Sequence, residues 1–297
     1  MKSVFAFALL LICSLIAAET WIYEKTVVEL PMGEADNQLS LRLAPECCEG
    51  MDEGMDEGPT SFTIDEDENI YVITRRKDII KKFDRYGNYI CSSEYERNAG
   101  GPIRFLGYHD GMIYTMSGDS RAPYIRRYTR ELELVDCHKV RKQEGSFTGL
   151  SFIENNSGNF GLLRNSDPRA IGATELVLNN NQYSLQRMDL FDFQYRPVDL
   201  KEKWATNIGY RFINHDRDNN LYIENLIAPL TATALGIITE NGDFIYTDVV
   251  FDSHIVHGIH FYDRIYPVVS KSGIVYNLLV TEDNIELIRW QKTGVEQ

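Results

Sequence analysis

Three of the chain's six histidines lie close together, at His254, His257 and His260. Three imidazole groups are enough to bind Zn²⁺ or Cu²⁺ and still leave one coordination position open for chemistry. In a β-strand, however, residues three apart point to opposite faces, so His254 and His260 would share a side that His257 does not. A turn at Gly258 would be needed to bring all three together. The alternative is that they are ordinary polar residues of a strand or loop.

A second candidate metal site is the tandem repeat of EGMD in residues 49–58. Its carboxylates provide the oxygen ligands that Ca²⁺ prefers. The fixed ligand spacing of an EF-hand loop is missing, and a glycine at every fourth residue favours a flexible acidic loop. We therefore expect no cofactor, with Zn²⁺ at the histidines or Ca²⁺ at this repeat as the alternative.

Arginine recurs in three segments, 75–77, 117–123 and 164–169. The planar guanidinium group matches the geometry of carboxylates and phosphates. In a chain with 44 acidic and 30 basic residues, this recurrence predicts an anion-binding arc made of Arg75, Arg76, Arg121, Arg164 and Arg169. The alternative is that these are solvated charges balanced by Asp78, Asp119 and Asp167.

Motifs of established chemistry are missing from the sequence. It has no GxSxG nucleophile elbow, no P-loop and no HExxH zinc motif. We assign no catalytic residue, and whether the chain is an enzyme stays open, with the balance against it.

The elements that must position these residues come from an internal repeat. Residues 58–90 predict two strands joined by a tight acidic turn, then two more joined by a Gly-Asn turn. The turn-then-strand pattern recurs about every 40–60 residues, which indicates a repeat architecture. Its equivalent strand positions are Tyr71, Tyr114, Gly161, Tyr222 and Tyr276. The downstream half of the repeat also recurs, and it predicts third strands that begin at residues 124, 183 and 235. The short polar residues Asp65, Asn155, Asp216 and Ser270 share one turn position, where we interpret them as structural.

Four short strands per repeat, with no convincing helix, predict an all-β fold: a β-propeller of four-stranded blades. We expect six blades, with five as the alternative. The strand predicted at residues 21–30 has no blade of its own, and we expect it to close the ring against residues 285–290. Loops between second and third strands lie on the rim where ligands usually bind, and the arginine segments are such loops. The loops of the opposite rim are rich in aspartate.

The repeat in residues 58–87, including Gly58, Phe62 and residues 65–72 and 80–84, resembles the NHL-type repeat of six-bladed propellers. The lead-in from Leu30 to Leu41 resembles secreted bacterial propeller proteins of unassigned role. The likeness is good over residues 58–135 and fair over 205–247. It implies a scaffold rather than a chemistry, because related rings include calcium-dependent lactonases, a zinc amidating lyase and protein-binding platforms. We carry no ligand residue over from them.

The first 18 residues read as a signal peptide, with one lysine, an apolar run of about 13 residues and Ala-Ala before Glu19. The run is shorter than the roughly 20 residues of a membrane span. We expect export to the periplasm or outside the cell, a closing strand and acidic loop at 19–57, and repeats at 58–297 that form one domain with them. Export permits disulfides, and we expect bridges from Cys47 or Cys48 to Cys91 and Cys137.

The net charge and the expected localisation together restrict the possible binding partners. A formal charge of −14 and export both disfavour nucleic acid. We expect a monomeric binding module that recognises a protein, an acidic small molecule or an acidic glycan at the arginine rim. The alternative is a metal-dependent hydrolase or lyase that works at the central channel.

Overall fold

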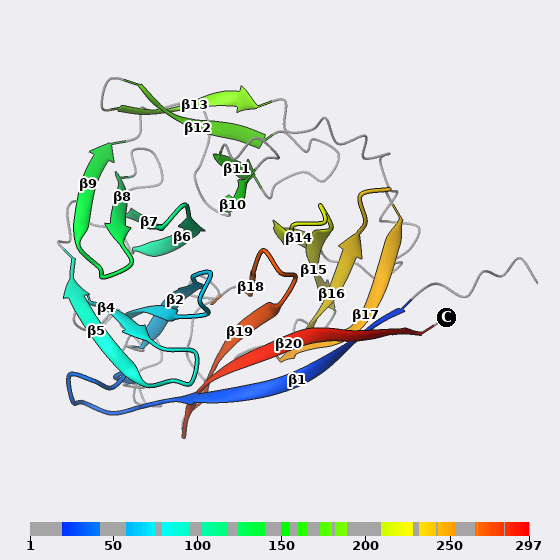
Figure 1. Cartoon of the computed structure of the whole chain (residues 1–297), viewed down its shortest axis with the longest axis horizontal. Coiled ribbons are helices and arrows are strands. Elements are labelled where there is room, and N and C mark those ends of the chain that lie inside the picture. The colour runs from blue at the N-terminus through cyan, green and yellow to red at the C-terminus, as the bar shows by residue number, and fades with distance from the viewer. Residues whose placement is uncertain are drawn as a thin grey trace, which may run out of the picture.

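The computed structural model is all-β and propeller-like, with four-stranded sheets arranged around a common centre (Figure 1). It describes residues 20–41, 58–74, 79–95, 103–117, 124–139, 150–154, 160–164, 173–179, 182–188, 209–227, 232–241, 243–252, 265, 267–281 and 283–296. In this part of the chain there is no helix long and apolar enough to cross a membrane.

Three sheets each contain four consecutive antiparallel strands. Sheet 1 consists of β2 (Pro59–Ile64), β3 (Ile70–Thr74), β4 (Ile79–Phe83) and β5 (Tyr89–Glu94). Sheet 2 consists of β6 (Arg104–His109), β7 (Met112–Ser117), β8 (Tyr124–Thr129) and β9 (Leu134–Lys139). Sheet 3 consists of β10 (Leu150–Glu154), β11 (Phe160–Arg164), β12 (Ala173–Asn179) and β13 (Gln182–Met188).

The remaining strands form one eight-stranded sheet made of two such groups. Group 4 consists of β14 (Gly209–His215), β15 (Leu221–Ile227), β16 (Ala232–Ile238) and β17 (Phe244–Asp252). Group 5 consists of β18 (Val268–Val269), β19 (Val275–Val280), β20 (Ile285–Glu296) and the N-terminal strand β1 (Thr20–Leu30). The two groups join where Thr20 and Trp21 of β1 pair in parallel with β17.

The first strands of the groups contact one another in a closed order. β2 contacts β6, β6 contacts β10, β10 contacts β14, β14 contacts β18, and β18 contacts β2. Neighbouring groups pack face to face through buried apolar clusters. Groups 5 and 1 share Leu278, Leu287, Phe62 and Val72, while Tyr71 and Ile113 lie in the cluster between sheets 1 and 2. In these pairs, each sheet therefore covers a face of its neighbour that would otherwise be exposed.

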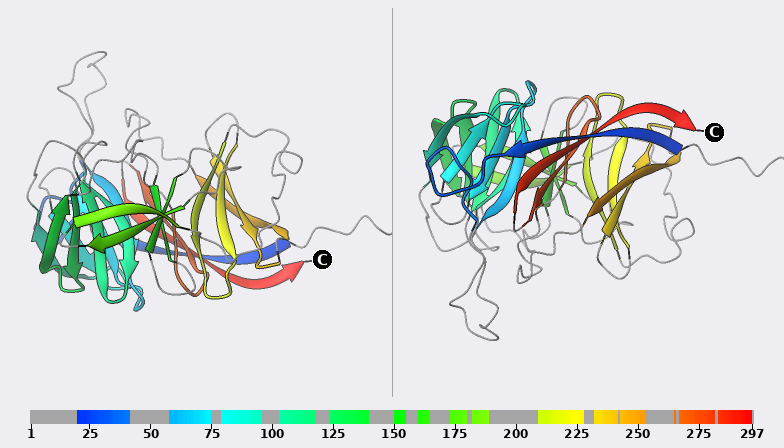
Figure 2. Two further views of the ribbon diagram at one scale, coloured as in Figure 1. Left: turned by 90° about the horizontal axis from the view of Figure 1, so that it is seen from above. Right: turned by 90° about the horizontal axis from the view of Figure 1, so that it is seen from below.

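The predicted closing strand is confirmed. β1 pairs antiparallel with β20 from Thr20 opposite Glu296 to Leu30 opposite Ile285, with one irregularity after Ile22. Figure 2 shows the two strands side by side from both directions. Tyr71, Tyr114, Gly161, Tyr222 and Tyr276 also lie, as predicted, in the second strand of their groups.

Two predictions were wrong. Residues 183–188 were expected to be the third strand of the third repeat, but they lie in β13, the fourth strand, and Ala173–Asn179 is the third. The connection before β12, residues 165–172, is twice as long as its counterpart 75–78. The third strand therefore begins at a different distance from the second strand than in the first repeat. Cys91 and Cys137 have free thiols, so the bridges expected to them are not present. Cys47 and Cys48 lie outside the described residues.

The closing strand gives a direct test of the fold. Trp21 is 8% exposed and lies in the cluster between groups 4 and 5, whereas Val27 on the same strand is 47% exposed. Trp21→Ala should lower the free energy of unfolding by about 3–5 kcal/mol, the usual range for a buried tryptophan, as measured by denaturant titration. Val27→Ala is the matched control and should cost less than about 1 kcal/mol. Equal losses in the two variants would show that β1 does not close the ring in this way.

Candidate functional site

The predicted arginine arc falls largely outside the described residues. Arg75 and Arg76 lie between β3 and β4, Arg121 between β7 and β8, and Arg169 between β11 and β12. Arg164 is the last residue of β11. The strand bounds nevertheless show that all three segments connect the second and third strands of consecutive sheets, as predicted.

The other predicted sites cannot be located either. His254, His257 and His260 lie between β17 and β18 and, like residues 49–57 of the acidic repeat, lie outside the described ranges. Within the described ranges there is no group of three His, Cys, Asp or Glu side chains placed to hold a metal ion.

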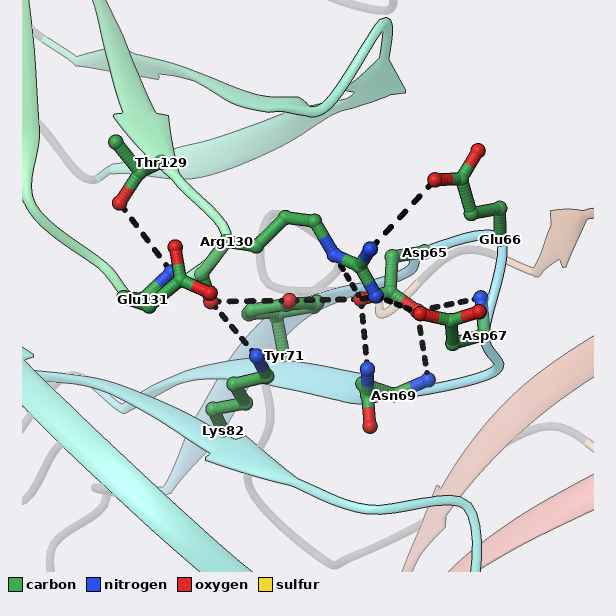
Figure 3. Close-up of polar contacts among 9 residues, drawn as sticks. All are labelled: Asp65, Glu66, Asp67, Asn69, Tyr71, Lys82, Thr129, Arg130 and Glu131. Carbon is green, nitrogen blue, oxygen red and sulfur yellow. Dashed lines mark hydrogen bonds and ion pairs between the residues drawn. The ribbon is translucent and has the colours of Figure 1, made fainter.

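Among the described side chains, polar groups concentrate around the turn between β2 and β3 (Figure 3). Asp65, which is 3% exposed, accepts at Oδ1 the backbone N–H groups of Asp67 and Asn69, both at 2.9 Å. Its Oδ2 accepts the Asn69 side-chain amide at 2.9 Å and the Tyr71 hydroxyl at 2.8 Å. One buried carboxylate therefore satisfies four donors of a turn whose outer residues are exposed.

Sheet 2 supplies the other half of this cluster. The Arg130 Nε donates to Asp65 at 3.3 Å, and its guanidinium also pairs with Asp67 and, at 3.6 Å, with Glu66. The Arg130 carbonyl accepts the Tyr71 hydroxyl at 3.2 Å and the Lys82 ammonium at 2.9 Å. The bond to Asp67, and then the charge of Asp65, raise the pKa of Arg130. These contacts join two sheets, so we interpret the cluster as structural.

The same arrangement recurs between groups 4 and 5. Asp216 accepts the N–H groups of Asp218 and Asn220, the Asn220 amide, all at 2.9 Å, and the Tyr222 hydroxyl at 3.0 Å. The Tyr222 hydroxyl lies 3.4 Å from the Gly273 carbonyl of the next group. The structural interpretation of Asp65 and Asp216 is therefore confirmed, as it is for Ser270, whose Oγ accepts the Ile274 N–H at 3.2 Å. Asn155 lies outside the described residues.

The aspartate-rich rim is also less negative than the sequence suggests. Arg130 from sheet 2 pairs with the acidic turn, and Arg289 of β20 donates to Glu68 at 3.0 Å from the other side. Two arginines, one from each neighbouring sheet, thus offset part of the charge of the four carboxylates at residues 65–68.

Among the described residues, three cations are buried that the sequence analysis missed, Lys81, Lys82 and Arg126. Lys81 and Arg126, 3% and 2% exposed, are each the third residue of a third strand and pair with Val72 and Thr115 at equivalent positions. Lys81 donates to the Asp36 carbonyl at 2.7 Å, and Arg126 donates to the Ser117 hydroxyl. Both lie near the strand ends that the arginine segments connect. The repeated pattern in residues 80–83 and 125–128, apolar, basic, basic, aromatic, is the signal that would have revealed them.

No protein-family model and no curated protein sequence matches this chain. Among solved structures, a protein of unknown function from Bacteroides thetaiotaomicron is similar with a TM-score of 0.45 and 7% identity, over 91% of this chain and 76% of that one. A putative gluconolactonase is similar with a TM-score of 0.41 and 10% identity, over 83% and 81%. A catalytically inactive variant of virginiamycin B lyase from Staphylococcus aureus has a TM-score of 0.41 and 10% identity, over 89% and 99%. At these values we draw no conclusion about activity.

The turn cluster predicts that replacing Asp65 costs more stability than replacing Asp84, although the two side chains hold similar turns. Asp84 makes the same 2.9 Å bonds to its own turn as Asp65 does, to Tyr86 N, Asn88 N and the Asn88 amide, but it is partly exposed and Ile90 replaces the tyrosine. Asp65→Ala leaves buried donors unpaired and should lower the free energy of unfolding by about 3 kcal/mol, while Asp84→Ala should cost about 1 kcal/mol. Denaturant titration measures both, and equal costs would contradict a role for Asp65 between sheets.

The tyrosines of the clusters predict a loss of stability in alkali. Burial, followed by the charge of Asp65, raises the pKa of Tyr71, and burial also raises that of Tyr222. Above pH 10, about the ordinary tyrosine pKa, the unfolded chain ionises these hydroxyls while the folded chain keeps them protonated, so stability is complete below that pH and falls as pH rises.

Each such tyrosine contributes a slope of about 1.4 kcal/mol per pH unit. Tyr71→Phe should therefore flatten the decline above pH 10 by that amount, and Tyr222→Phe should do the same. Unfolding free energies measured from pH 8 to pH 11 give the slopes. A slope in Tyr71→Phe that equals that of the unmodified chain would show that the hydroxyl ionises as readily in the folded state.

Proposed function

We propose that this chain is an exported β-propeller binding module, and that it recognises an anionic ligand or an acidic partner at the end of the ring that carries the arginine segments. The observation that supports this is the recurrence of arginine at one position of the repeat. Three consecutive sheets have arginine in, or at the start of, the connection between their second and third strands, and these connections leave the same end of each sheet.

We take the ring as five-bladed. The closed order of contacts among β2, β6, β10, β14 and β18 supports this number, as does the membership of β1 in group 5. With five blades, segments 75–78, 118–123 and 165–172 belong to three of the five, so the arginines would cover more than half of one rim.

Buried charge below that rim favours the same ligand. Lys81 and Arg126 place two cations close to the strand ends of sheets 1 and 2, and burial reduces the screening of their charge. An anion bound by the arginine segments would also interact with these buried cations through the protein. The alternative, a metal-dependent hydrolase or lyase, depends on His254, His257 and His260, and no described contact supports it.

The test is to replace Arg75, Arg76, Arg121, Arg164 and Arg169 together by glutamine and to measure binding of heparin and of poly-L-glutamate by calorimetry. The unmodified chain should bind at least one of these polyanions, with affinity that falls as salt rises. The fivefold variant should bind at least about tenfold more weakly, which is about 1.4 kcal/mol.

The control is a variant with Lys25→Gln and Arg217→Gln, two exposed cations outside the arc. It should keep the affinity of the unmodified chain if position matters and total charge does not. Equal weakening in both variants, or no binding of either polyanion to the unmodified chain, would overturn the proposal.

A further inference from the structure

A cavity of about 690 Å³ lies at the outer side of groups 5 and 1, where three segments far apart in the sequence meet. They are the end of β1 with the loop after it, the turn between β4 and β5, and the segment between β19 and β20. Figure 1 shows the loop after β1, in blue, beside the cyan strands of sheet 1. The volume is typical of small-molecule sites, which span about 300–1,000 Å³.

We infer that this cavity binds a neutral carbohydrate, a short oligosaccharide, independently of the arginine rim. The inference depends on three features: walls that are fixed in advance, an exposed aromatic ring held in place by Arg85, and polar groups on the described lining residues that are uncharged or negative.

The first wall, the loop at residues 31–41, is fixed by its own hydrogen bonds. The Leu39 N–H donates to the Pro31 carbonyl at 2.7 Å, and the Gly33 N–H donates to the Leu39 carbonyl at 3.0 Å. Leu39 is fully buried, and the buried Lys81 ammonium anchors the loop to sheet 1 through the carbonyls of Asp36 and Gln38. A loop with this many internal bonds loses little entropy when a ligand binds.

The other two walls are equally ordered. Asp84 holds the β4–β5 turn, and Gly87 at φ 87° lets it approach β1 so closely that a Cβ there would lie 2.5 Å from the Glu29 carbonyl. In the third wall, the Asn284 N–H donates to Thr281 Oγ1 at 3.1 Å and its side chain donates to Glu286 at 2.8 Å. The cavity is therefore formed before any ligand arrives.

The aromatic ring is that of Tyr86, which is 67% exposed. The Arg85 guanidinium lies 4.9 Å from its centroid and donates to its hydroxyl at 2.7 Å. A large ring that is exposed but restrained in this way presents an apolar surface at low entropic cost. The C–H faces of sugar rings pack on such surfaces.

The polar side chains that line the cavity suit the hydroxyl groups of a sugar better than they suit an anion. No hydrogen bond or ion pair is described for the side chains of Asn37 and Asp283, and Asn88 keeps its amide oxygen after donating to Asp84. Amides and carboxylates together offer the donors and acceptors that a sugar hydroxyl, which is both, requires. The described residues that line the cavity include the acidic Glu29 and Asp283 and no Lys, Arg or His, so this lining favours a neutral sugar over an acidic one.

The experiment is saturation-transfer NMR followed by calorimetry, with cellotetraose, maltotetraose, mannotetraose and chitotetraose as probes and spermidine as a cationic competitor. At least one neutral saccharide should bind, and salt should change its affinity by less than twofold. Tyr86→Ala and Asn37→Ala should each weaken it at least tenfold, whereas Tyr124→Ala, a half-exposed tyrosine of sheet 2 outside the cavity, should not.

Three results would overturn the inference: no saccharide binding, saccharide binding that Tyr86→Ala leaves unchanged, or salt-sensitive binding of spermidine alone that Asp283→Asn abolishes. Tyr86 and Asn37 are exposed, so their variants should unfold at the temperature of the unmodified chain. The fivefold arginine variant should keep saccharide binding, which separates failure here from failure of the proposed anion site.

Discussion

The polar contact between sheets 1 and 2 depends on one buried carboxylate, that of Asp65. A turn at the end of a sheet that packs face to face must bury N–H groups with no strand partner, and each would cost free energy if left unpaired. Asp65 accepts two of them, as well as the Asn69 amide that completes the turn. It also fixes the Tyr71 hydroxyl, which then reaches the Arg130 carbonyl of the next sheet. The local turn and the contact between sheets are thus one network, and its recurrence at Asp216 shows that the ring uses it repeatedly.

This network decides where function can lie. The acidic turn at residues 65–68 is engaged with both neighbouring sheets through Arg130 and Arg289, and we therefore interpret it as structural. The opposite ends of the sheets have longer connections, and there the cations Lys81 and Arg126 lie buried beside them. The proposed anion site therefore lies at the end of the sheets opposite to the structural charges of residues 65–68.

The sequence was a good guide to local pattern and a poor one to anything that depends on distant contacts. The turn at residues 65–69 and the strand containing Tyr71 follow from residue types a few positions apart, and the pairing of β1 with β20 follows from a strand left without a sheet. The burial of Lys81 does not follow, because a lysine in a third strand reads as solvent-exposed unless the carbonyls of Asp36 and Gln38 are known to face it. The third strand of the third repeat was misassigned for a related reason. The connection before it is longer than in the other repeats, so the spacing of the repeat did not point to Ala173–Asn179.

The cavity beside β1 could not have been predicted for the same reason, since Glu29, Tyr86 and Asp283 become neighbours only when the ring closes. Closure also fixes its shape: the Gly87 turn contacts the Glu29 carbonyl, so the cavity exists only while β1 is paired with β20. A chain in which β1 detached would lose one wall of the cavity and the cover of the cluster around Trp290 together. Pairing of the N-terminal strand therefore links the stability of the ring to the integrity of this cavity. The arginine segments, in contrast, connect strands of sheets 1 to 3, and β1 pairs with none of these strands.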